Sequence, residues 1–71
     1  MWFWVVFWLD EEQNIQEFFS TTGFNSDREA TTDYNLKTEY INEGLEDLGC
    51  VSVTDCQIVF KKNGVYKGIF H

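Results

Sequence analysis

An uninterrupted apolar run at the start of the chain, Trp2 to Leu9, predicts a β-strand. The run contains only aromatic, β-branched and leucine side chains, and it is shorter than an ordinary helix. Alternate side chains of a strand point to opposite faces, so this strand is apolar on both faces. A row of tryptophans, Trp2, Trp4 and Trp8, lies on one face, and the phenylalanines lie on the other.

A polar break over residues 10–14 separates this strand from a second apolar segment. Residues 14–22 predict the other strand of a hairpin. A helix is the alternative, because Ile15, Phe18 and Phe19 also have helical spacing. We favour the hairpin, since the serine and threonine residues that close the segment would end a helix early.

A single helix is predicted over residues 27–48. Ser26 and Glu29 have the spacing of a capping box at its start, and Gly49 is placed to end it. Gly44 inside the helix costs up to ~1 kcal/mol, so we expect the last turn to fray or bend. The apolar stripe of this helix consists of Ala30, Tyr34, Ile41, Leu45 and Leu48.

The remaining residues predict two paired strands, 50–62 and 65–70, joined at Asn63-Gly64 by a two-residue type I′ turn. The apolar positions change parity within the first of them, which predicts a bulge or break near Thr54-Asp55. Residues 1–71 therefore predict one α+β domain, in which one helix packs on an antiparallel sheet of about four strands. The expected order is β-β-α-β-β.

The charge of the chain narrows the classes of function. The formal net charge is −7, from 12 acidic and 5 basic residues, so we expect no direct binding of nucleic acid. No window reaches the ~18 to 20 apolar residues of a membrane span. The apolar run at the start follows no basic region, and only two cysteines occur. We therefore expect a cytoplasmic protein with reduced thiols.

Residues typical of catalytic and ligand-binding sites are scarce. The one histidine, His71, would lie opposite Cys56 across the predicted hairpin; a half-buried cysteine is favoured over an activated thiolate. Cys50 and Cys56 are too far apart along a straight strand to form a disulfide unless a turn at Thr54-Asp55 folds the segment back, so two free thiols are favoured. The carboxylates of Asp10-Glu11-Glu12 lack the pattern of a calcium loop and indicate a solvated turn. We predict a protein that is not an enzyme and binds no cofactor and no metal.

Negative charge is concentrated in residues 10–47, which hold eleven carboxylates against two basic side chains, a local balance of −9. On the predicted helix, apolar Leu36 and Tyr40 lie among these carboxylates. This composition is typical of a binding patch for a basic partner. Equally, it fits a solvated face on which Leu36 and Tyr40 cover a sheet edge. The predicted partner-binding residues are Glu29, Asp33, Leu36, Glu39, Tyr40, Glu43, Glu46 and Asp47.

The aromatic strand provides a second candidate surface. One helix covers one face of the sheet, so the other face exposes either the tryptophan row or the phenylalanine row. Tryptophan is enriched at binding hot spots, and we therefore expect self-association through Trp2, Trp4 and Trp8. The alternative is that residues 20–26, with Phe24, fold over that side.

In its small size, acidity, lack of proline and predicted element order, the chain resembles the small accessory proteins encoded by bacteriophages. These include inhibitors of host enzymes and the anti-CRISPR proteins. The resemblance involves no residue motif and transfers no functional residue. It implies a non-enzymatic inhibitor of a larger basic partner in the host cytoplasm, such as a nucleic-acid enzyme with a basic groove. The alternative function is a structural or assembly module that self-associates through its N-terminal strand.

Overall fold

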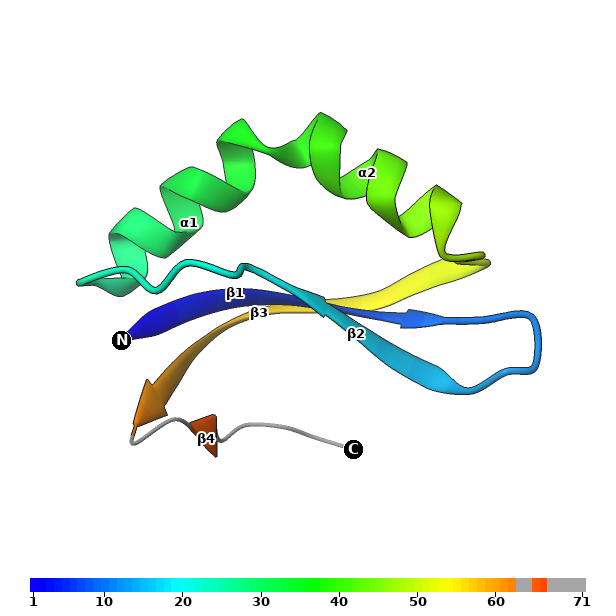
Figure 1. The fold of residues 1–71 in the computed structure, drawn as a ribbon, viewed down its shortest axis with the longest axis horizontal. Coiled ribbons are helices and arrows are strands. Elements are labelled where there is room, and N and C mark those ends of the chain that lie inside the picture. Colours follow the sequence, from blue (N-terminus) through cyan, green and yellow to red (C-terminus); the bar gives the residue numbers. More distant parts are fainter. Residues whose placement is uncertain (63–64, 67–71) are drawn as a thin grey trace.

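Two helices cover one face of an antiparallel sheet, so the chain is α+β as predicted (Figure 1). The structure is a computed structural model that describes residues 1–62 and 65–66. Its elements are β1 (Trp2–Leu9), β2 (Ile15–Phe19), α1 (Asp27–Leu36), α2 (Thr38–Asp47), β3 (Ser52–Lys62) and β4 (Val65–Tyr66).

The sheet has the strand order β2-β1-β3-β4, with β1 in the centre and antiparallel to both neighbours. As far as the structure describes it, β4 has two residues, which pair with the end of β3. The helices therefore lie over a three-stranded sheet, β2-β1-β3. The predicted order β-β-α-β-β is wrong in its helical part, because two helices stand between β2 and β3.

The hairpin between β1 and β2 is confirmed, with Leu9 opposite Ile15. Its loop is organised by the carboxylate of Asp10, which accepts hydrogen bonds from the backbone N–H groups of Asn14 and Glu12, both at 2.9 Å. The Gln16 side chain donates to the same carboxylate at 3.0 Å. These bonds, led by the one from Asn14, hold the pKa of Asp10 below its ordinary value of 3.8. The acidic loop is thus a hydrogen-bonded turn.

Strand β2 is shorter than the predicted segment 14–22. It ends at Phe19 because the next residue, Ser20, bonds to β1 through its side chain as well as its backbone. The Ser20 hydroxyl accepts from the Trp4 N–H at 3.3 Å, and the Ser20 N–H donates to the Trp4 carbonyl at 3.1 Å. This arrangement buries Ser20 and directs the chain across the end of the sheet, where Phe24 forms an isolated bridge with Trp2.

The bulge predicted near Thr54-Asp55 is confirmed. Phe7 pairs with Asp55 and Trp8 pairs with Val53, so Thr54 has no partner in the ladder. Its hydroxyl donates instead to the Phe7 carbonyl at 3.1 Å. Strand β3 begins two residues later than the predicted 50–62, at Ser52.

Strands β3 and β4 pair in the register that a two-residue turn requires. Lys61 lies opposite Tyr66, and Lys62 lies opposite Val65. The predicted turn at Asn63-Gly64 and residues 67–71 lie outside the described residues, as does the proposed neighbour of Cys56, His71.

The predicted helix 27–48 is broken at Lys37. Ser26 caps its start as predicted, accepting from the Glu29 N–H at 3.1 Å. At the break, the Thr38 hydroxyl donates to the carbonyls of Asn35 at 3.0 Å and Tyr34 at 3.4 Å. These bonds occupy carbonyls at the end of α1, and Lys37 adopts φ −104° and ψ 18°. The two helices consequently form an arch whose apex is this junction (Figure 1).

The second helix ends where the sequence predicts. Gly49 has φ +87°, and its N–H donates to the Glu46 carbonyl at 3.1 Å while the Cys50 N–H donates to the Leu45 carbonyl at 3.0 Å. This pair of bonds is a Schellman motif. Gly44 serves a different purpose: a Cβ there would lie 2.8 Å from the Phe18 ring, so glycine leaves room for this ring of β2 against α2.

The core has two layers, because β1 is buried on both faces. On the helix side it consists of Trp4, Val6, Trp8, Ile41 and Leu45. On the other side it consists of Val5, Phe7 and Val59, with Phe3 packed against them. The tryptophan row therefore faces the helices, which settles a choice that the apolar pattern left open.

Candidate functional site

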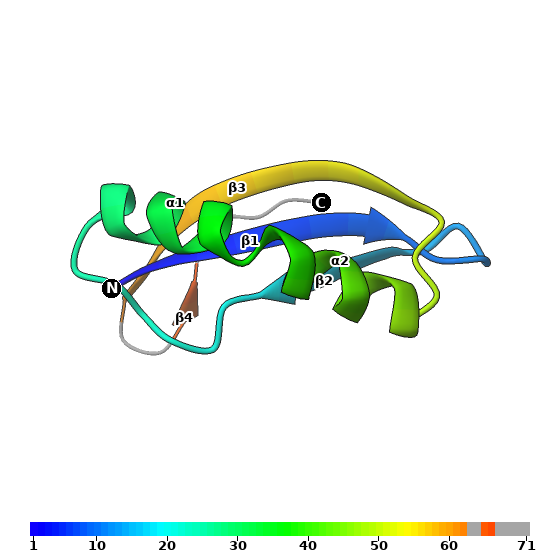
Figure 2. The ribbon, with the colours of Figure 1, turned by 90° about the horizontal axis from the view of Figure 1, so that it is seen from above.

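The outward side of the two helices carries the exposed carboxylates that the sequence predicts. They are exposed, and the two helices that carry them are seen from above in Figure 2. Within residues 1–60, their side chains make no ion pair or side-chain hydrogen bond. Because no cation neutralises them there, they present an unbalanced negative surface, which we call the acidic helix face. Its members are Glu29, Glu39, Glu43, Glu46 and Asp47.

Asp33 does not belong to this face, because its carboxylate is turned toward Trp4. It is half-buried, and its carboxylate accepts a hydrogen bond from the Trp4 indole Nε1–H at 2.8 Å. The same carboxylate forms an ion pair with Lys37 at 3.3 Å. Asp33 is drawn inward because the Trp4 side chain, only 2% exposed, needs an acceptor for its N–H.

Leu36 and Tyr40 flank the helix junction and are strongly exposed, at 80% and 63%. The Tyr40 ring lies 6.4 Å from the Phe18 ring of β2, so it also covers part of the sheet edge. Among the contacts of the described residues, none shows Leu36 covering the sheet edge. The two apolar side chains thus lie beside the acidic helix face, as the sequence predicts. Tyr40 is exposed beside this face and also covers part of the sheet edge.

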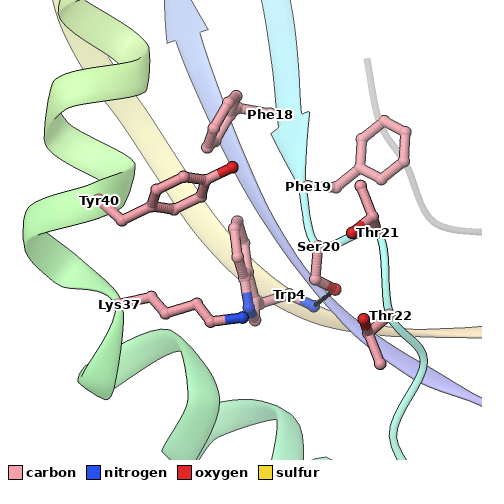
Figure 3. A pocket seen from close by; sticks show the side chains of 8 residues that line it. All are labelled: Trp4, Phe18, Phe19, Ser20, Thr21, Thr22, Lys37 and Tyr40. Atoms are coloured by element: carbon pink, nitrogen blue, oxygen red, sulfur yellow. Dashed lines mark hydrogen bonds between the residues drawn. The ribbon is translucent and has the colours of Figure 1, made fainter.

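A pocket of about 380 Å³ opens beneath the helix junction. Lys37 and Tyr40 enter it from the helix side, the segment after β2 forms the opposite wall, and the Trp4 indole lies between them (Figure 3). The Trp4 ring is fixed by Phe18, at 6.1 Å between ring centroids, as well as by Asp33. The lining side chains are Trp4, Phe18, Phe19, Ser20, Thr21, Thr22, Lys37 and Tyr40.

The sequence did not predict this pocket, although two of the residues that line it, Trp4 and Tyr40, were candidate site residues. The pocket exists because the helices arch away from the sheet at Lys37, and an unbroken helix over residues 27–48 has no such arch. Thr38 alone was no signal for the break, because Thr31 and Thr32 make the same hydroxyl-to-carbonyl bond inside the unbroken α1.

The tryptophans predicted to mediate self-association lie mostly inside the protein. Trp4 and Trp8 are 2% and 4% exposed under the helices, while Trp2 is half-buried against Phe60, at 5.3 Å between ring centroids. In addition, β1 is hydrogen-bonded to a strand on each side. Phe24 packs against the tryptophan side, which the helices cover, and not over the opposite face as the alternative interpretation expected. Trp4 and Trp8 are therefore core, whereas Trp2 is half-buried.

Cysteine chemistry is limited to one contact in the described part of the chain. The Cys56 Sγ lies 2.9 Å from the Tyr34 hydroxyl, and this hydrogen bond, with partial burial, raises the pKa of Tyr34 to about 12. Cys50 and Cys56 are free thiols, as predicted. No group of three or more metal-ligating side chains occurs among the described residues.

Compared with protein-family models, curated proteins and solved structures, the chain has no significant match. Within the described residues, neither α1 nor α2 is long and apolar enough to cross a membrane.

Proposed function

We propose that the protein is a non-enzymatic binding protein that inhibits or modulates a larger, basic partner. The acidic helix face is the contact surface, and a nucleic-acid enzyme with a basic groove is the class of partner that fits it. Carboxylates held on helices can occupy sites that otherwise bind phosphates and can accelerate encounter with a positive surface. The proposed setting is the cytoplasm of the cell that contains the partner.

The observation that carries the proposal is the position of Leu36 and Tyr40. Both are large, strongly exposed side chains within a stretch whose local charge balance is −9. A face that serves only solubility has no need of exposed apolar residues, whereas an interface needs apolar anchors surrounded by charge. The opposite interpretation, assembly through the aromatic strand, has less support because Trp4 and Trp8 are buried.

Affinity capture with charge-reversed bait tests the proposal. The test variant carries Glu39→Lys and Glu43→Lys on the acidic helix face. The matched control carries Glu11→Lys and Glu12→Lys in the β1–β2 loop, so both variants have the same net charge. We expect one basic protein from the native cell to be captured by the parent and by the control, and to be lost with the test variant. Equal loss with both variants would show that only the total charge matters and would contradict the proposal.

A further inference from the structure

The pocket beneath the helix junction is mostly apolar, with Ser20, Thr21 and Thr22 on one wall, and has no unbalanced positive charge. The rings of Trp4, Phe18 and Tyr40 form most of its surface on the helix side of the sheet (Figure 3). Among its described lining residues the one charged side chain is Lys37, and its ammonium is already paired with Asp33 at 3.3 Å. The pocket is therefore poorly suited to an anion and well suited to an apolar group.

The surroundings of the pocket are acidic. Glu39 directly precedes Tyr40 on α2, and Glu43 lies one turn further, so its Cβ is about 5–6 Å from that of Tyr40. Both carboxylates are exposed and have no ion-pair partner within residues 1–60. An apolar group that carries neighbouring positive charges consequently fits this place better than a neutral or negative one.

We propose that the pocket receives one large apolar side chain from a lysine- or arginine-rich segment of the partner. The cationic side chains of that segment pair with the carboxylates of Glu39 and Glu43. The inference rests on the proposed function, because the same partner supplies the segment. A volume of about 380 Å³ accommodates one ring or branched side chain but not a folded element. Leu36, next to the junction residue Lys37, is a further exposed apolar side chain, which a polypeptide can cover and a small molecule in the pocket leaves exposed.

Three short peptides with blocked ends test the inference at low salt: Lys-Lys-Phe-Lys-Lys, Lys-Lys-Ala-Lys-Lys and Glu-Glu-Phe-Glu-Glu. The readout is the NMR signal of the Trp4 indole Nε1–H, which lies at the pocket and is bonded to Asp33. We expect the phenylalanine–lysine peptide to shift this signal and to bind about tenfold more tightly than the alanine peptide. The glutamate peptide should leave the signal unchanged.

Two variants separate the pocket from the rest of the surface. Thr21→Trp places a ring at the exposed wall of the pocket, and Asn42→Trp adds the same ring to α2 about 200° around the helix from Tyr40. Thr21→Trp should abolish the advantage of phenylalanine over alanine and keep the weak binding of both lysine peptides. Asn42→Trp should preserve that advantage.

Each outcome distinguishes the inference from the proposed function. Equal binding of the two lysine peptides, with no shift at Trp4, overturns the inference and leaves the acidic helix face as a contact surface. Equal binding of the glutamate and lysine peptides that contain phenylalanine overturns the requirement for a basic segment. Failure of both lysine peptides to bind the parent contradicts the proposed function as well.

Discussion

Replacing Gly44 with alanine tests the close approach of the Phe18 ring to α2. Gly44→Ala would gain about 1 kcal/mol of helix propensity at an open position. Here the new Cβ would lie 2.8 Å from Cζ and 3.2 Å from Cε1 of Phe18. Overpacking of this kind costs about 1–3 kcal/mol, so the net change in the free energy of unfolding should lie between zero and a loss of about 2 kcal/mol.

A double-mutant cycle with Phe18→Leu isolates the contact. Leucine lacks the two ring atoms that the new Cβ meets, so Gly44→Ala in that background should stabilise the protein by about 1 kcal/mol. The coupling between the two sites is then about 1–3 kcal/mol. Urea unfolding of the parent, both single variants and the double variant, followed by tryptophan fluorescence, measures it. An equal gain of about 1 kcal/mol in both backgrounds would refute the close approach.

Three further predictions concern single contacts. Asp33→Ala leaves the Trp4 indole N–H without its acceptor and should lower the free energy of unfolding by about 1–3 kcal/mol in the same urea assay. Asp33→Asn retains an oxygen that can accept this hydrogen bond, so it should lower the free energy of unfolding by less. Gly49→Ala forces a side chain into φ +87° and should cost about 1–2 kcal/mol, again measured in urea. The pKa of Tyr34 is raised from 10.0 to about 12, so the protonated Tyr34 hydroxyl stabilises the folded state below pH 10, and this stabilisation is lost as the pH rises through 12. An ultraviolet titration should show that Cys56→Ala returns the pKa of Tyr34 toward 10.0.

Sequence patterns were sufficient where the determining interactions are local. The cap at Ser26 and the left-handed residue at Gly49 each depend on partners within a few positions along the chain. The bulge at Thr54 was visible because a change of parity can be read from the strand itself. The exposure of Glu39 and Glu43 followed from helical phase alone.

The features that the sequence did not reveal depend on distant contacts. Strand β1 is apolar on both faces, so no pattern within it specifies which face meets the helices. Asp33 looked like a surface carboxylate because its partner, Trp4, is 29 positions away. The helix break was hidden because the apolar residues on either side of Lys37 continue in helical phase.

The ionic-strength dependence of association tests the central claim, that the acidic helix face meets a basic partner, most directly. The association rate constant of the parent with the captured partner should fall by about tenfold between low salt and ~0.15 M ionic strength, since steering depends on the summed field. A variant with Glu39→Lys, Glu43→Lys and Glu46→Lys should remain folded, within ~1 kcal/mol of the parent, because it exchanges one set of like charges for another. It should associate slowly at every salt concentration. An association rate for the parent that is independent of salt, or equal to that of the variant, would contradict the account.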